Sequence, residues 1–150
     1  WERRIVKTTF KQFYEKTVIG LVEDIEIAGI GRVSAKVDSG NGYASALDAQ
    51  DIDRQGDKVT FTTIGGKRLI KDVIEVVNIN VGAGHIEERP VVLFRIKFGG
   101  VEFDNIPFTL ANRANNDHKV LIGREFIKQL DALIDVNAKN IATKRIEVQV

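Results

Sequence analysis

The sequence predicts a mainly β fold: a closed or sandwiched β-barrel with one short helix near its C-terminal end. Three observations support this prediction. The chain is rich in Val, Ile and Thr, which favour strands. Its 13 glycines and only 2 prolines separate many short segments in which apolar and polar residues alternate. One stretch near the end has helical rather than strand periodicity. Many short strands at close spacing are typical of barrels and sandwiches.

The first 16 residues are charged and aromatic, and we divide the chain into an N-terminal arm, residues 1–16, and a domain, residues 17–150. The arm is interpreted as a short helix or as a segment that docks on a partner, with a frayed terminus as the alternative. Strand character begins at Thr17. Residues 32–37 alternate polar and apolar side chains, which predicts a half-buried strand that runs directly into a turn at Asp38-Ser39-Gly40.

The middle of the chain predicts two hairpins and a strand between them. Each hairpin has a Gly-Gly pair at its turn, because glycine adopts the backbone angles that tight turns require. The second hairpin is the clearer one, since Val92, Phe94, Ile96 and Phe98 alternate with Leu93, Arg95 and Lys97. The predicted segments are 59–64 with 67–70, then 72–81, then 92–98 with 101–103.

The last predicted elements follow a polar loop. Val120-Leu121-Ile122 is a short, fully apolar strand that ends at Gly123. Residues 124–133 then place four apolar side chains on one helical face, which predicts a helix. Strand regions are expected at 134–136 and 141–150.

The composition excludes several classes of function. The chain has no Cys, so disulfides, thiol catalysis and thiolate metal sites are excluded. A net charge of +1 gives no clustered basic face, and we expect no nucleic-acid partner. No apolar run is long enough to span a membrane and no signal peptide is visible. We therefore expect a cytoplasmic protein of bacterial or viral type that does not associate with membranes.

Asp38-Ser39-Gly40 is the segment that points most directly to chemistry. A carboxylate on a tight turn at the end of a strand is presented to a ligand, and glycine allows another backbone to approach closely. By itself the tripeptide is also compatible with an ordinary turn in which the Asp side chain binds the backbone.

The order of segments resembles the retropepsin family of aspartic peptidases. An apolar strand leads into Asp-Ser-Gly, and a later apolar strand leads into Gly-Arg and a helix. Within that group the chain is most similar to the family labelled ATP-dependent zinc proteases, which are retropepsin-like domains found with ATP-grasp ligases. The segments that carry the resemblance are 18–23, 35–40, 45–49, 88–92, 110–113, 120–127 and 134–136.

The resemblance implies a retropepsin-like closed β-barrel and one catalytic Asp38 in each chain of a homodimer. Two carboxylates must share one proton and hold one water, and the chain has no second Asp-Ser/Thr-Gly. A second copy would supply the other carboxylate across a two-fold axis. The resemblance also implies a peptide or protein substrate and an ATP-grasp-type or assembly partner. Its remaining site residues are the active-site loop supports Ser39, Gly40, Asn41, Gly123 and Arg124.

A retropepsin also needs a flap, a hairpin that closes over the substrate. We place it at residues 81–88, with Gly82, Ala83, Gly84 and His85 at the tip; residues 64–67 are the alternative. No spacing of histidines is typical of a metal site, and nothing resembles a phosphate-binding loop. We therefore expect no metal and no cofactor.

Two features differ from the family pattern. Ser39 stands where Thr is usual, which keeps the hydroxyl, and Asn41 stands where Ala is usual. Asn41-Gly42-Tyr43 also carries one extra residue before Ser45. The leading hypothesis is an aspartic endopeptidase that cleaves peptide or peptide-like amide bonds. The rival hypothesis is a non-catalytic structural or assembly module on the same fold, and a small-molecule- or carbohydrate-binding barrel is the third.

Overall fold

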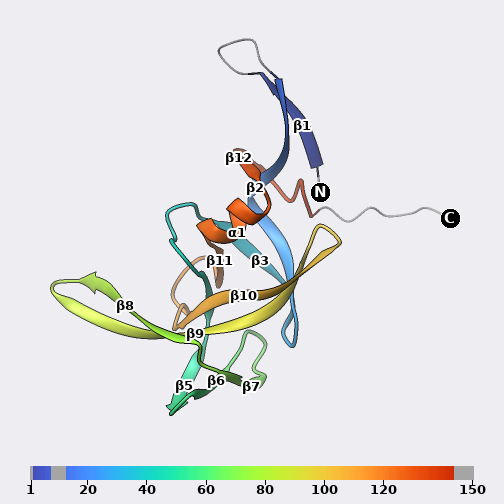
Figure 1. The fold of residues 1–150 in the computed structure, drawn as a ribbon. Helices are drawn as coiled ribbons and strands as arrows, with labels where there is room; N and C mark the ends of the chain where they lie inside the picture. The colour runs from blue at the N-terminus through green and yellow to red at the C-terminus, as the bar shows by residue number, and fades with distance from the viewer. Residues whose placement is uncertain (1, 8–12, 144–150) are drawn as a thin grey trace.

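The computed structural model describes residues 2–7 and 13–143, and this part of the chain is mainly β with one short helix (Figure 1). The mainly β prediction is therefore confirmed. In chain order the elements are β1 (Glu2–Lys7), β2 (Phe13–Ile27), β3 (Gly31–Val37), β4 (Ser45–Asp48), β5 (Gln50–Gln55), β6 (Lys58–Thr62), β7 (Arg68–Asp72), β8 (Glu75–Gly82), β9 (His85–Phe98), β10 (Val101–Ala111), β11 (Val120–Ile122), α1 (Arg124–Gln129) and β12 (Ala132–Lys139).

Nine strands form the main sheet in the order β1-β2-β3-β11-β4-β10-β9-β8, with β12 paired to β2. The sheet returns on itself, because β2 also pairs with β9 through Glu26↔Lys97 and Ile27↔Ile96. The pairings β2-β3-β11-β4-β10-β9 therefore make a ring. Most neighbours are antiparallel, but three pairs run parallel: β3 with β11, β4 with β10, and β2 with β12. The parallel pairs bring distant parts of the chain to the same sheet edge.

The remaining strands form a smaller sheet, β5-β6-β7, that lies against β9. Lys71 on β7 joins the two sheets. Its ammonium group donates a 2.9 Å hydrogen bond to the carbonyl of Leu93 and lies 4.1 Å from the centre of the Phe94 ring. Burial lowers the pKa of Lys71, because the charged form loses hydration there, and Asp72 opposes this shift.

The core lies inside the ring of strands. Phe94 and Phe108 pack edge to face across β9 and β10, with ring centres 5.7 Å apart, and Phe126 of α1 packs against Phe98 at 5.9 Å. Aromatic pairs of this geometry stabilise a core beyond the area that they bury. The alternation predicted for 92–98 is confirmed, since Val92, Phe94, Ile96 and Phe98 all point into the core.

The N-terminal residues pair as a strand, so the short helix considered for the arm is not formed over residues 2–7. β1 and β2 make an antiparallel hairpin that projects from the body, at the top of Figure 1. β2 is continuous from Phe13 to Ile27 and so passes through the division that we drew between residues 16 and 17.

Besides β1, two strands, β4 and β5, were not predicted, and the helix is shorter than expected. In the strand region expected at 141–150, residues 141–143 do not form a strand, and the rest lies outside the described residues. All four residues of β4 are buried, so their side chains show no alternation, whereas β5 is polar and exposed after its first residue. The helix ends at Gln129 rather than near Leu133, because Asp131 adopts a left-handed backbone (φ 49°) and Ala132 begins β12.

Candidate active site

Asp38 lies immediately after β3, where the chain leaves the sheet. Its backbone N–H donates a 2.9 Å hydrogen bond to the carbonyl of Ile122, the last residue of β11. The parallel pairing of β3 and β11 makes this contact, since Val37 and Ile122 are register partners. Two segments far apart in the sequence thus fix the position of Asp38, whose side chain is half-buried.

The turn after Asp38 is held by hydrogen bonds between residues of the turn itself. The N–H of Gly40 donates to Oδ1 of Asp38 at 3.0 Å, and the N–H of Asn41 donates to the Asp38 carbonyl at 3.1 Å. The Asn41 amide then donates to the carbonyl of Ala44 at 2.9 Å. These contacts orient the carboxylate relative to the sheet and leave it in contact with solvent. Asn41 therefore closes the loop, and its role as an active-site support stays a prediction.

The start of α1 supports the same loop from the other side. The N–H of Arg124 donates a 2.8 Å hydrogen bond to the carbonyl of Asn41, and the N–H of Gly123 donates to the Ser45 hydroxyl at 2.9 Å. A Cβ atom on Gly123 would lie 2.6 Å from the carbonyl oxygen of Ala44, so only glycine fits. The sequence analysis gave Ser45 no role; its position in a run of small residues was the only signal.

The structure thus brings the predicted loop and support residues together at one end of β3 and β11. Ser39 and Gly40 are exposed at the tip of the turn, and a Cβ on Gly40 would meet only Oδ1 of Asp38, at 3.2 Å. The exposed position of Ser39 is open to a partner. The role of Ser39 as an active-site loop support stays a prediction, and so does the catalytic role of Asp38.

Arg113 is a charged neighbour of Asp38 that the sequence analysis did not single out. Burial lowers the pKa of Arg113, and repulsion by Arg89 lowers it further, whereas Asp48 and Asp38 oppose the shift. The charges of Arg89, Asp48 and Asp38 therefore all act on the Arg113 guanidinium. Segments 88–92 and 110–113 contain both arginines, but no pattern within them indicated that Arg89 and Asp38 both lie near Arg113.

Asp48 holds the backbone beside Arg113. Its side chain is 7% exposed, and its Oδ1 accepts hydrogen bonds from the N–H of Arg113 at 2.6 Å and from the Gln50 amide at 2.8 Å. The Arg113 guanidinium in turn donates to the carbonyl of His118 at 3.1 Å. Both of these hydrogen bonds fall on Oδ1 of Asp48, and both donors belong to the same chain.

The expected flap residues form the tip of the β8–β9 hairpin, which extends away from the body at the left of Figure 1. Gly82 and His85 are register partners across the turn, and Gly82, Ala83 and Gly84 all have positive φ. The tip is exposed, including the apolar side chains of Val81 and Ile86. The alternative segment 64–67 is the turn between β6 and β7 in the smaller sheet. In the described part of the chain, the hydrogen bonds of Asp38 are made with Gly40, Asn41 and Ile122 and with neither of these segments.

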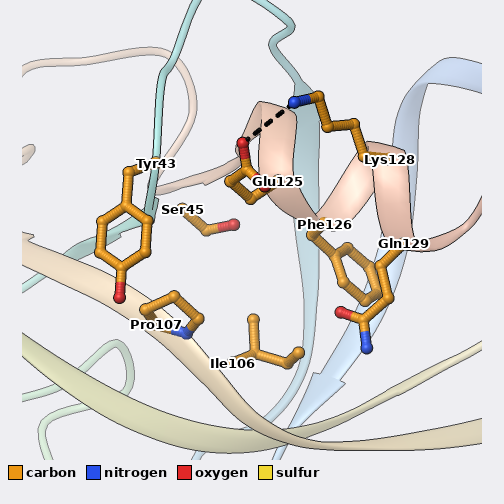
Figure 2. Close-up of a pocket in the computed structure, with 8 residues that line it drawn as sticks. All are labelled: Tyr43, Ser45, Ile106, Pro107, Glu125, Phe126, Lys128 and Gln129. Carbon is orange, nitrogen blue, oxygen red and sulfur yellow. Dashed lines mark hydrogen bonds and ion pairs between the residues drawn. The ribbon is translucent and has the colours of Figure 1, made fainter.

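A hollow of about 510 Å³ lies between the Asp38 loop, β10 and α1 (Figure 2). Tyr43 and Pro107 stand on one side of it, and Phe126 and Gln129 stand on the other. Tyr43, which belongs to the part of the loop that departs from the family pattern, is half-exposed. The extra residue therefore places an aromatic ring on the surface beside the loop without breaking the contacts of Asp38.

The described residues contain no group of three or more His, Asp or Glu side chains arranged to hold a metal ion. Within the same residues, no helix is long and apolar enough to cross a membrane.

The mainly β fold and the Asp38 loop are compatible with a retropepsin-like protein, and the comparison with known families supports this class. The family model for RimB-like proteins, described as retropepsin-like aspartic endopeptidase RimB, matches residues 18–145. The chain therefore belongs to the RimB-like family of retropepsin-like proteins. The expected resemblance to retropepsins is confirmed. The label of ATP-dependent zinc protease and the association with ATP-grasp ligases have no support from this match.

A solved structure has the same fold. It is the crystal structure of a protein of unknown function (DUF785) from Legionella pneumophila, which is 25% identical to this chain with a TM-score of 0.70. The similarity covers 85% of this chain and 98% of the Legionella chain. No curated protein sequence matches this chain significantly.

Proposed function

We propose that the protein is an aspartic endopeptidase that hydrolyses peptide or peptide-like amide bonds, with Asp38 contributed by each of two chains. The observation that carries this proposal is the loop of Asp38. Its N–H is fixed to Ile122, its turn is closed by Gly40 and Asn41, and the carboxylate keeps access to solvent. Such a loop can place a carboxylate beside an identical one on a two-fold axis.

The partner carboxylate has to come from a second copy. Asp48 is the other carboxylate in the electrostatic neighbourhood of Arg113, but it is buried and accepts hydrogen bonds from Arg113 and Gln50. Its own chain thus holds Asp48 in a structural role, and we assign the partner carboxylate to Asp38 of a second copy. Two Asp38 carboxylates in one site could not both ionise easily, because like charges at close range repel, so the pair would hold one proton.

The reaction then proceeds by general acid–base catalysis. The ionised Asp38 takes a proton from a bound water, whose oxygen attacks the amide carbon, while the protonated Asp38 of the second chain donates its proton to the amide oxygen. In the second step the carboxyl that took the proton of the water gives it to the amide nitrogen and the C–N bond breaks, while the ionised carboxylate takes a hydroxyl proton as the carbonyl re-forms. One amide and one water thus become a carboxylic acid and an amine. The β8–β9 hairpin is the element suited to cover the substrate, because it is long and has a glycine-rich tip.

The test is digestion of a peptide library, with new termini identified by mass spectrometry. Asp38→Asn should abolish cleavage while the protein stays folded. Asp53→Asn, on exposed β5, is the matched control and should cleave as the wild type does. Equal cleavage by wild type and Asp38→Asn would overturn the proposal. Absence of cleavage by a dimeric wild type would also overturn it, and would favour the non-catalytic assembly module instead.

A further inference from the structure

The smaller sheet lies at the base of the β8–β9 hairpin, which the proposed function treats as the flap (Figure 1). Its strands β5, β6 and β7 come between β4 and β8 in the chain, and β7 is in contact with β9. The chain passes from β7 to β8 through Val73 and Ile74 alone. A change in how the smaller sheet holds this base would therefore reach the whole hairpin.

The hairpin has little packing beyond its base. Residues 85–88 of β9 are exposed on both faces of the strand, whereas residues 90–92 are buried. None of the residues of β8 is fully buried. Segments with few buried apolar contacts are the least stable parts of a fold and the first to open. The orientation of the hairpin therefore depends on contacts made where β9 enters the core.

Two adjacent N–H groups tie the start of the hairpin to the two sheets separately. The N–H of Val73 donates to the carbonyl of Asp57 at 2.7 Å, in the turn between β5 and β6. The N–H of Ile74 donates to the carbonyl of Val91 at 2.9 Å, in β9. A hollow of about 250 Å³ beside these residues leaves the joint incompletely packed. The joint therefore attaches the hairpin to both sheets but leaves it room to tilt.

Lys71 fills a gap in the hydrogen bonds of β9. On the edge of β9 that faces away from β10, the carbonyls of Val91 and Arg95 accept hydrogen bonds from the segments just before β8 and just after β2. Residues two apart in a strand point their carbonyls to the same edge, so the carbonyl of Leu93 lies between these two attachments. The pairing of β8 with β9 extends only to Val91, and that of β2 begins at Ile96. The Lys71 ammonium group, at 2.9 Å, is the donor to Leu93 in this gap.

The same ammonium group rests on the core. It lies 4.1 Å from the centre of the Phe94 ring, and Phe94 packs edge to face on Phe108. A hydrogen bond from a charged donor and a cation over an aromatic ring both favour one fixed position of the ammonium group. Lys71 therefore joins the smaller sheet to β9 at the point where β9 passes from the hairpin into the ring of strands.

We infer that Lys71 is a positioning residue for the flap: by bridging the gap at Leu93, it sets the angle at which the β8–β9 hairpin covers a substrate. The inference rests on the proposed function, because it concerns the closing of that site over a peptide. Without the bridge, the hairpin would occupy its closed position for a smaller fraction of the time. Apparent affinity falls in proportion to the population of the competent state, so the loss would affect KM and not kcat.

The first test is steady-state kinetics on a fluorogenic peptide built on a sequence that the wild type cleaves. Lys71→Met keeps a long apolar side chain against Phe94 but removes the donor to Leu93. It should raise KM about 10-fold while kcat changes by less than about twofold. Lys71→Arg keeps a charged donor and should restore most of the wild-type KM. Lys58→Met is the matched control, because Lys58 is an exposed lysine of the same sheet that pairs with Asp72, and both constants should stay unchanged.

The second test needs no substrate. Amide hydrogen exchange of the wild type, read by mass spectrometry, should be faster in residues 75–89 than in residues 94–98. Lys71→Met should speed exchange in the hairpin and leave residues 94–98 unchanged, whereas Lys58→Met should change neither. Circular dichroism and urea unfolding establish that each variant is folded. A wild-type hairpin as well protected as residues 94–98 would overturn the inference whether or not Lys71→Met folds.

The outcomes separate the two proposals. A raised KM with unchanged kcat, together with faster exchange in the hairpin alone, supports the inference. An active wild type whose KM and hairpin exchange are unchanged in Lys71→Met overturns the inference but leaves the proposed function standing. A lower kcat with faster exchange throughout the protein would mean that Lys71 only stabilises the fold, and this also overturns the inference. A wild type that cleaves no peptide overturns the proposed function, and the role of Lys71 in covering a substrate falls with it, whatever the exchange of the hairpin.

Discussion

The backbone N–H of Gly123 donates a 2.9 Å hydrogen bond to the hydroxyl of Ser45, and both residues are buried. This contact joins the start of α1 to the start of β4, directly behind the Asp38 loop. Close approach is possible because Gly123 has no side chain, since a Cβ there would lie 2.6 Å from the Ala44 carbonyl oxygen. The contact therefore depends on both residue types at once.

Ser45→Ala should lower the free energy of unfolding by about 1–3 kcal/mol, because it leaves the buried N–H of Gly123 without an acceptor. Urea unfolding measures the change. Ser34→Ala, on an exposed position of β3, is the control and should change stability by less than about 0.5 kcal/mol. Equal stabilities of the two variants would show that the contact contributes nothing.

Gly123→Ala should be more damaging, because the added Cβ meets backbone atoms that cannot move without shifting the Asp38 loop. We expect a loss of about 2–4 kcal/mol in stability and of peptide cleavage. Gly42→Ala is the matched control in the same loop. Its Cβ would meet only a guanidinium nitrogen of Arg124, at an ordinary 3.7 Å. A fully stable and active Gly123→Ala protein would contradict the steric argument.

Glu23 is a buried carboxylate that binds backbone donors near the end of the described chain. It accepts hydrogen bonds from the N–H groups of Gly20, Ala142 and Thr143, and from the Thr143 hydroxyl at 2.7 Å. Glu23→Ala should destabilise the protein by about 3 kcal/mol or more, because several buried N–H groups lose their acceptor. Limited proteolysis should then cut near Thr143 at a higher rate. Glu26→Ala, exposed on the same strand, should leave both the stability and the cut unchanged.

Lys71 predicts a pH dependence whose sign follows from its lowered pKa. Between its folded pKa and the ordinary value of 10.5, the unfolded chain binds more protons at this position than the folded chain does. Stability therefore rises with pH across that window, and the contribution is complete above 10.5. Lys71→Met should remove this rise when unfolding is compared with wild type at successive pH values. If the free energy of unfolding of the wild type instead fell with increasing pH relative to that of Lys71→Met, burial would be excluded as the dominant influence on the Lys71 pKa.

Alternating side chains made strands β3 and β9 of the ring predictable, and the Gly-Gly pair at 99–100 made the turn between β9 and β10 predictable. Residues 32–37 and 92–98 each have one buried and one exposed face, so period-two patterning survives in the sequence. β4 is buried on both faces and β5 is almost wholly exposed, so neither shows a contrast between faces. The early end of α1 was not predictable either, because a left-handed Asp131 gives no signal in the pattern of apolar residues.

Residues of the candidate site that belong to a short motif could be predicted from the sequence. Residues that the fold brings together from distant segments could not. Asp38, Gly40 and Gly123 were identified because each follows an apolar strand and because the order of these segments resembles that of the retropepsins. Arg113 was not, because its proximity to Asp38 arises from the loop after β10, which Asp48 anchors. The periodicity of apolar residues in one sequence predicts helices and strands, but it does not indicate which loops lie close together in the fold.

The hydrogen bond between the N–H of Asp38 and the carbonyl of Ile122 has a consequence for biosynthesis. The parallel pairing of β3 with β11 cannot form until the last third of the chain has been made, and contacts between such distant segments are slow to form. A nascent chain on the ribosome thus carries Asp38 on an unorganised loop. Any hydrolytic activity of this chain would therefore be delayed until residues 120–122 have been made and have paired with β3.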